Sequence, residues 1–326
     1  MLRLFGPDCT PALIDAGQVT ALPPGAIWID LFEPTKEEEK LAEQLIGTNI
    51  PTREELSEIE PSSRLYQKKK AAFMTMSVIF GVTGGQPASD PVGFILTDKH
   101  LVSVRYIDPK PFIIFAENLY AEPELAENSR TVFVRLLDAI IDRLADEFQV
   151  AGKDIEAISS RIFNSHMHRG TRAAPELRLE AILMRVGRVE QLLAKLRETS
   201  VSSTRLLTFL QTIALIEEDP VNKRHVGSLI ADAHALNDHS NFLGDNLTFL
   251  LDATLGLISL EQNTVMKIFS IFAVVFMPPT LIAGVYGMNF EHMPELKWLY
   301  GYPYALVLMV ASAVIPFWVA RRRGWL

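Results

Sequence analysis

The sequence contains a single cysteine, Cys9, and it lacks several features that define common classes of protein. One cysteine cannot form an internal disulfide, and no histidine or second cysteine stands near it at metal-site spacing. The N-terminal residues lack the basic flank, long apolar run and cleavage site of a secretory signal, so we expect the chain before its first apolar segment to be cytosolic. No glycine-rich loop is followed by the Lys and Ser or Thr of a phosphate-binding motif, which argues against a nucleotide-driven pump.

Positive charge is also scarce. The chain carries 31 Lys and Arg against 39 Asp and Glu, a formal net charge of -8. Nucleic-acid binding needs a basic face, so nucleic acid is not an expected partner. The acidity suits an encounter with cations, and it equally suits the solubility of a cytosolic domain.

Two C-terminal segments, 268–286 and 304–320, contain no Asp, Glu, Lys or Arg. Each is about long enough to cross a hydrocarbon core of roughly 30 Å as a helix, so we predict two transmembrane helices. A basic tail, 321–326, begins with three arginines, whereas the connecting loop, 287–303, contains only one lysine. Because positive residues remain on the cytoplasmic side, both termini are expected there, in a multi-pass inner (plasma) membrane protein.

Upstream, residues 1–125 alternate apolar runs with turn signals, and this pattern predicts a cytosolic α/β domain. Strands are expected at 26–32, at 71–80 and as a hairpin within 92–106 that turns at Asp98-Lys99. Helices are expected to start after Pro34-Thr35 and to cover 52–59.

From Ser129 onward the apolar residues recur at helical spacing, which predicts a helical hairpin over 126–202. Gly170 and Pro175 interrupt it, and its second helix is expected over about 175–197. A further helical pattern begins near Ser203 and continues as a stalk, 203–267, into the first transmembrane helix. A helix on the order of 100 Å long cannot bury its apolar stripe against one small domain, so a parallel bundle of identical subunits is expected.

Mostly small or polar residues form one stripe on this helix at alternating steps of three and four. The stripe runs backward from the end of the first transmembrane helix through Thr280, Met277, Ala273, Ser270, Met266, Asn263, Ser259, Gly256 and Asp252. Such a stripe can be a close-packing surface between membrane helices. Its continuation beyond the membrane favours a second interpretation, the lining of an ion pathway around the bundle axis.

A short motif follows the stripe at the outer end of the first apolar segment. It reads Gly287-Met288-Asn289, with Tyr286 before it and Phe290 after it, downstream of Met277-Pro278-Pro279-Thr280 and upstream of Met293-Pro294-Glu295-Leu296. This constellation resembles the signature of the CorA family of magnesium channels. The resemblance implies a funnel-shaped homopentamer, import of Mg²⁺ with Co²⁺ or Ni²⁺ as possible surrogates, and sensing of cytosolic Mg²⁺ between subunits.

The chemistry of the motif suits a divalent cation that gives up its water reluctantly. A ring of Asn289 amide oxygens, with backbone carbonyls beside Gly287, would accept hydrogen bonds from a hydrated ion without trapping it. Asn289 could also cap the helix. Glu291 and Glu295 in the outer loop would raise the local cation concentration, or they are ordinary loop residues.

Asp238, Asp245 and Asp252 repeat every seven residues on the stalk. In a parallel bundle they would lie along one seam, where repulsion between like charges would be relieved by bridging Mg²⁺. The alternative is a solvated acidic stripe.

The sequence therefore predicts a divalent cation channel and not an enzyme. Its expected partners are identical subunits, the lipid bilayer and divalent cations. Mg²⁺ is expected as the transported ion and as a possible regulator, with no organic cofactor. Two alternatives stay open: a zinc transporter of the same superfamily, and a cytosolic sensor that the two apolar helices merely tether.

Overall fold

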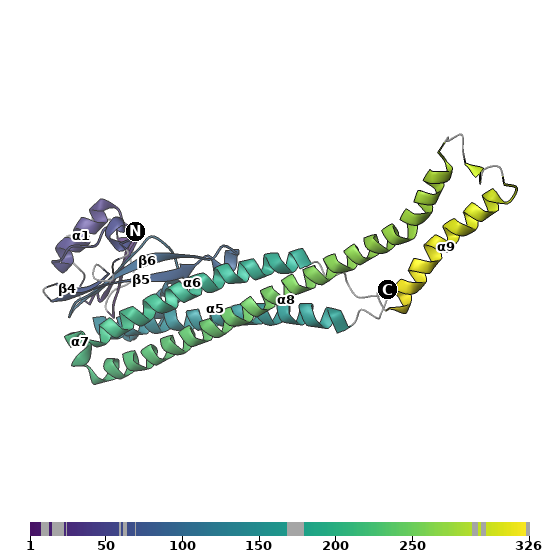
Figure 1. Ribbon diagram of the computed structural model, residues 1–326. Helices are drawn as coiled ribbons and strands as arrows, with labels where there is room; N and C mark the ends of the chain where they lie inside the picture. Colours follow the sequence, from purple (N-terminus) through teal and green to yellow (C-terminus); the bar gives the residue numbers. More distant parts are fainter. Residues whose placement is uncertain are drawn as a thin grey trace. The chain divides into compact units, whose positions relative to one another are not determined.

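The structure is a computed structural model of the chain, and its secondary structure is drawn in Figure 1. It describes residues 1–7, 13–14, 23, 25–58, 60, 64–68, 70–167, 179–288, 293–294 and 298–323. The chain divides into two compact units, Met1–Leu251 and Asp252–Leu326, and each unit is treated separately below.

A seven-stranded sheet forms the centre of the first unit, in the order β2-β1-β3-β7-β6-β5-β4. Its strands are β1 (Leu2–Phe5), β2 (Leu13–Ile14), β3 (Trp28–Phe32), β4 (Leu65–Lys68), β5 (Ala71–Phe80), β6 (Ala88–Leu96) and β7 (Leu101–Arg105). Neighbouring strands are antiparallel except β3 and β7, which are parallel. The predicted strands at 26–32 and 71–80 and the hairpin within 92–106 are thus present.

Short helices border one face of the sheet, α1 (Lys36–Ile46) and α2 (Arg53–Leu56). Thr35 and Thr52 each cap one of them through a reciprocal capping box, which explains why both helices start where the sequence predicted. Ala42 and Leu56 pack with the apolar residues of this face. The second helix ends at Leu56, before the predicted position 59, which lies outside the described residues.

The remaining helices of this unit cover the opposite face of the sheet. They are α4 (Lys110–Ala121), α5 (Ser129–Met167), α6 (Leu179–Gln211), α7 (Ala214–Glu217) and the first part of α8 (Pro220–Tyr286), with 3-10 turns η1 (Val82–Gly84) and η2 (Pro123–Leu125). Met76, Phe94, Phe133, Leu207 and Val226 join the sheet and these helices in one core. The N-terminal part of α8 is therefore built into the soluble unit.

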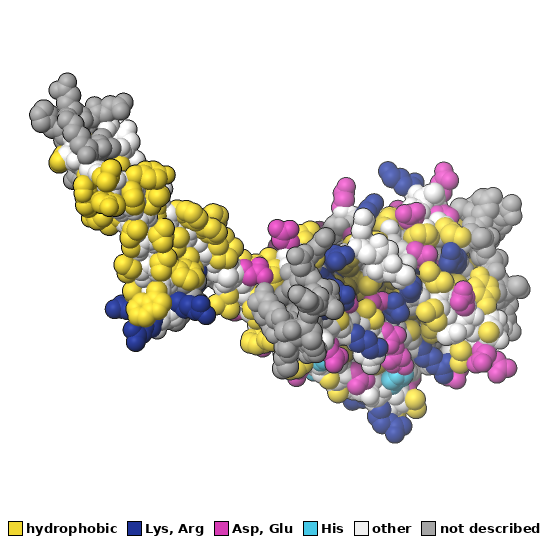
Figure 2. Space-filling model, turned by 90° about the vertical axis from the view of Figure 1, so that its right-hand side faces the viewer, with side chains coloured by type: hydrophobic (Ala, Val, Ile, Leu, Met, Phe, Trp, Pro, Cys, Tyr) yellow, Lys and Arg dark blue, Asp and Glu magenta, His cyan; other side chains and the backbone are white. Residues whose placement is uncertain are grey.

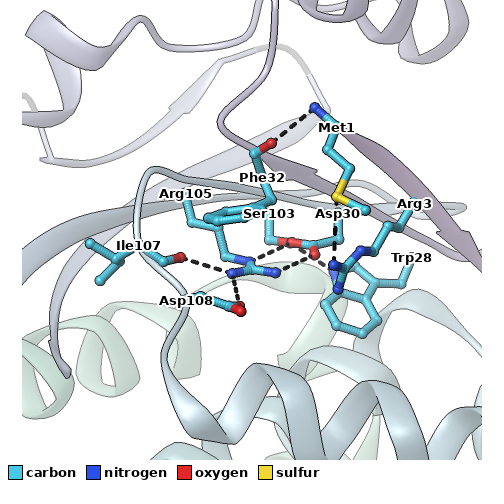
Figure 3. Close-up of polar contacts among 9 residues, drawn as sticks. All are labelled: Met1, Arg3, Trp28, Asp30, Phe32, Ser103, Arg105, Ile107 and Asp108. Atoms are coloured by element: carbon cyan, nitrogen blue, oxygen red, sulfur yellow. Dashed lines mark hydrogen bonds and ion pairs between the residues drawn. The ribbon is translucent and has the colours of Figure 1, made fainter. Parts of the chain in front are cut away.

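A buried ionic network joins the two parallel strands β3 and β7 (Figure 3). The Asp30 carboxylate accepts hydrogen bonds from Ser103 Oγ at 2.7 Å and from Arg105 Nε and Nη2 at 3.0 and 2.9 Å. Trp28 Nε1 donates to Ser103 Oγ at 2.9 Å, and Arg105 also pairs with Asp108. Burial lowers the pKa of Arg105, but the Asp30 and Asp108 carboxylates outweigh it and hold that pKa above its usual range.

The boundary between the helical hairpin and the long helix differs from the predicted position at 202/203. Helix α6 continues to Gln211, and the hydroxyl of Ser203 within it donates to the Thr199 carbonyl one turn earlier. The long helix starts at Pro220, a residue that suits the first helical position. Asp219 Oδ1 accepts hydrogen bonds from the backbone N–H groups of Val221 and Asn222, both at 3.1 Å. Gly170 and Pro175, the predicted break, lie outside the described residues.

The second unit contains the remainder of α8 and helix α9 (Gly301–Arg322). Helices α8 and α9 are the two candidate membrane spans in the described part of the chain, with mean hydropathies of 2.2 and 1.9 in their most apolar windows. Those windows are 0% and 6% buried within the single chain. Hydrophobic side chains accordingly dominate the surface of this unit, with Lys and Arg at one end of it (Figure 2).

Candidate pore and metal-binding segment

All nine residues of the predicted stripe, from Asp252 to Thr280, lie within the continuous helix α8. Each is exposed in the single chain. At 100° per residue they remain within roughly a third of the helix circumference. The stripe is therefore a real face of the helix, and no part of the described chain covers it.

The hydroxyl groups of the stripe share one arrangement. Ser259, Ser270 and Thr280 donate to backbone carbonyls of the preceding turn at 3.1, 2.8 and 2.7 Å. Each hydroxyl hydrogen is thus used within the helix, and the oxygen keeps lone pairs as an acceptor. Oxygens of this kind are suited to accept hydrogen bonds from the water shell of a cation.

Two consecutive prolines, Pro278 and Pro279, lie inside α8 between Met277 and Thr280 in the sequence. Proline has no N–H, so the carbonyls of Val274 and Val275 lose their usual helical partners. Within a membrane, such carbonyls are tolerated where protein or water satisfies them.

Gly287 and Met288 continue directly from the end of α8. The Gly287 N–H donates to Ala283 O at 2.9 Å, and the Met288 N–H donates to Val285 O at 3.3 Å. A Cβ atom at position 287 would lie 3.0 Å from the Ala283 oxygen, which is a tight contact. Glycine therefore suits this turn because the chain passes close to its own helix end.

Three predicted site residues, Asn289, Glu291 and Glu295, lie outside the described residues. The amide ring and the acidic outer loop consequently remain predictions. Among the residues that the structure does describe, no group of three or more His, Cys, Asp or Glu side chains is placed to hold a metal ion.

Asp238 and Asp245 lie on the part of α8 that belongs to the first unit, and both are exposed. Leu243, Leu247 and Leu250 form the buried side of the same helix segment. At 100° per residue, the two aspartates are on the side opposite these leucines. They are therefore available to groups outside their own subunit.

Aromatic residues at both ends of α9 are a feature that the sequence reasoning missed. Trp298 packs against Tyr300 and Tyr304, with ring centroids 6.4 and 5.9 Å apart. At the other end, the Arg322 guanidinium lies 4.8 Å from the centroid of the Trp318 ring. Tyr300 and Trp318 are separated by about 27 Å of helical rise, which is close to the thickness of a hydrocarbon core. Aromatic and arginine residues that flank an apolar run are the usual signal of a membrane interface.

These features define a membrane protein with a candidate ion pathway. They are a soluble α/β unit, a long helix with a stripe of mostly small or polar residues, and apolar helical segments with aromatic residues at the ends of α9. The CorA-like Mg²⁺ transporter family matches residues 24–322. The chain belongs to the CorA family, so the predicted resemblance is confirmed.

Individual relatives agree with this assignment. The magnesium transport protein CorA of Salmonella typhimurium is 30% identical over 301 residues, which cover 92% of each chain. The complete structure of the CorA magnesium transporter from Methanocaldococcus jannaschii aligns with a TM-score of 0.77 and 18% identity over 100% of this chain and 98% of that one.

A further solved structure shares the fold over most of the chain. The ZntB cytoplasmic domain from Vibrio parahaemolyticus aligns with a TM-score of 0.56 and 10% identity, over 79% of this chain and 98% of that one. At this identity the similarity concerns the fold alone and does not bear on the ion.

Proposed function

We propose that this chain assembles into a homo-oligomeric channel that conducts Mg²⁺ into the cytoplasm, with Co²⁺ and Ni²⁺ as surrogate ions. The observation that carries the proposal is the stripe from Asp252 to Thr280, exposed along α8 in a chain of the CorA family. Within the apolar segment this face carries two polar side chains, Ser270 and Thr280, which are less favourable toward lipid than apolar ones. Placing it around a shared axis with other subunits puts it in contact with water and ions.

Selectivity would arise at the outer end of α8. Asn289 supplies neutral amide oxygens, and the carbonyls beside Gly287 and Met288 add further acceptors for a hydrated ion. Neutral acceptors bind a dication weakly enough for it to leave, which conduction requires. Mg²⁺ suits such a site because it retains several of its waters when bound.

The membrane potential would drive the ion. At roughly 2.3 kcal/mol per charge per 100 mV, a dication gains about 4.6 kcal/mol when it enters a negative cytoplasm. No second energy source is needed at this driving force.

The proposed assembly is a pentamer in which cytosolic Mg²⁺ regulates opening. Five subunits follow from the CorA resemblance, and parallel copies of α8 would surround the pore. Asp238 and Asp245 lie opposite the buried side of the helix, where they can approach neighbouring subunits. Mg²⁺ between them would favour the closed, tightly packed arrangement.

Ion flux into liposomes tests the channel. Purified protein is reconstituted with an internal Mg²⁺ dye and an imposed negative potential. Asn289→Ala should reduce the flux at least about tenfold, because it removes the acceptor amide. Asn246→Ala provides the matched control, since it removes an amide that lies off the stripe on the same helix. Parental flux in Asn289→Ala would refute the assignment of the site.

Two further measurements separate the alternatives. Native mass spectrometry should show one closed oligomer of five subunits, and a conducting monomer would contradict the axial pore. Zn²⁺ flux that exceeds Mg²⁺ flux and depends on a proton gradient would instead favour a zinc transporter. The absence of flux for every divalent ion would favour a tethered sensor.

A further inference from the structure

An arginine-lined pocket lies in the first unit, at the sheet edge beside α6. It has a volume of about 380 Å³, within the range of small-molecule sites. The pocket exists because β4 pairs only with the Ala71–Met74 portion of β5. Within the described residues, positions 75–80 of β5 have no strand partner on that edge, and α6 covers them instead. The Ser77 N–H donates to Ser202 Oγ on α6 at 2.9 Å.

Three guanidinium groups line this pocket: Arg64 before β4, and Arg197 and Arg205 on α6. Arg64 donates to the backbone carbonyl of Glu58, and Arg197 Nη2 donates to Asn241 Oδ1 at 2.9 Å. In the described part of the chain, no carboxylate forms an ion pair with any of the three.

One carboxylate, Glu198, also lines the pocket, but donors already surround it. It accepts hydrogen bonds from Ser89 Oγ at 2.7 Å and from Lys195 Nζ at 3.0 Å. Burial raises the pKa of Glu198, and these donors reverse the effect, so its pKa lies below the usual value. Lys195 balances its charge, and the three arginines leave the pocket strongly positive within a chain of net charge -8.

We infer that this pocket is a regulatory site for a small anion that carries two or more phosphoryl groups. Arginine presents planar pairs of N–H donors that match phosphate oxygens bidentately, and several such forks can share one polyphosphate. Thr75 and Ser202 line the same pocket, and their hydroxyl groups add hydrogen-bond donors. Polyphosphates are also strong ligands for Mg²⁺, the ion that we propose is transported. The site would therefore respond to anions that bind cytosolic Mg²⁺.

The pocket is coupled to the long helix through Arg197. Its guanidinium contacts α8 at Asn241, and a Cβ atom built on Gly244 would lie 3.5 Å from its Nη2. We place the anion at the Nη2 edge of Arg197, where it would compete with Asn241, so that binding would loosen a contact between α6 and α8. This regulatory consequence depends on the proposed channel function, whereas the binding itself does not.

Isothermal titration calorimetry on the full-length protein in detergent, without Mg²⁺, tests the binding with sodium tripolyphosphate as the probe. The parent protein should bind tripolyphosphate. It should bind orthophosphate at least about tenfold more weakly. Arg205→Gln and Arg197→Gln should each weaken tripolyphosphate binding about tenfold or more. Arg188→Gln is the matched control, an exposed arginine of α6 outside the pocket that should leave binding unchanged.

Asn241→Ala provides an independent readout, because it removes the competitor for Arg197 and should tighten tripolyphosphate binding a few-fold. Unchanged affinity in this variant would overturn the coupling to α8. Parental affinity in both pocket variants, or equal binding of orthophosphate, would overturn the site.

The proposal would also be overturned if the parent did not bind tripolyphosphate and Arg205→Gln made the oligomer dissociate. The arginines would then contact a neighbouring subunit instead of an anion. All of these measurements are independent of ion flux. Their failure would leave the channel proposal intact, and the absence of flux would leave the anion site intact.

Discussion

Asp30→Asn should destabilise the soluble unit by more than almost any other change of similar size. The side chain is 1% exposed and accepts three hydrogen bonds, two of them from Arg105. An asparagine would keep one acceptor oxygen, but its NH₂ group would face a guanidinium that can only donate. Arg105, itself 1% exposed, would lose its main counter-charge and keep only Asp108.

Breaking a buried pair in this way costs about 3–5 kcal/mol. For a unit of this size, each kcal/mol lowers the midpoint of thermal unfolding by about 2–4 °C, so a decrease of about 6–20 °C is expected. Near-UV circular dichroism of the full-length protein in detergent can follow the transition. Trp28 contributes to that signal, because it stacks on Phe5 with ring centroids 4.5 Å apart.

Two variants make the comparison decisive. Lys223→Met disrupts an exposed ion pair with Glu217 at 3.9 Å and should change the midpoint by no more than about 2 °C. Replacing both partners, Asp30→Leu with Arg105→Met, should recover most of the loss, because no unpaired buried charge remains. A midpoint for Asp30→Asn that matches the Lys223→Met value would refute the reasoning, as would a double variant less stable than Asp30→Asn.

Further expectations concern carboxylates on the helices. Joint replacement of Asp238 and Asp245 by Asn should leave the ion preference unchanged. It should raise the cytosolic Mg²⁺ concentration needed to inhibit flux. Channel closure at the same Mg²⁺ concentration as the parent would show that these two aspartates are only a solvated surface of the helix. Burial and three neighbouring aspartates raise the pKa of Asp142 above its usual value, so its ionised form is disfavoured in the folded protein. Asp142→Asn should therefore raise the thermal midpoint at pH 7, and the gain should shrink as pH falls through that raised pKa, where the parental carboxyl takes up a proton; a gain that is constant with pH would contradict this account.

The features that the sequence predicted correctly all depend on residues close together in the chain. Thr35 and Thr52 mark helix starts because a capping box involves positions only three apart. The stripe on α8 follows from a fixed rotation per residue, so its positions could be counted without knowing any partner. The resemblance to the CorA family was carried by contiguous residues, Gly287-Met288-Asn289, and the family match confirms that resemblance.

The boundary between α6 and α8 differs from its prediction, although a local signal for it, Asp219-Pro220, is present in the sequence. The predicted boundary near Ser203 is wrong, because α6 continues past it to Gln211 and the long helix starts at Pro220. Packing decided the matter: Leu206, Leu207 and Leu210 are fully buried against the sheet, and their burial keeps α6 helical to Gln211.

Tertiary structure alone decided the contacts between distant residues. Asp30 and Arg105 are 75 residues apart and meet because β3 and β7 pair in parallel with Asp30 opposite Ser103. Arg64 and Arg205 meet at one pocket because β4 begins only at Leu65, opposite Met74, and α6 covers the remaining edge of β5. Local propensity and apolar periodicity carry no information about strand order or register, since the same strands could pair in several ways with similar local energies. Only the joint packing of the two sheet faces selects one arrangement, and with it the charged groups that come together.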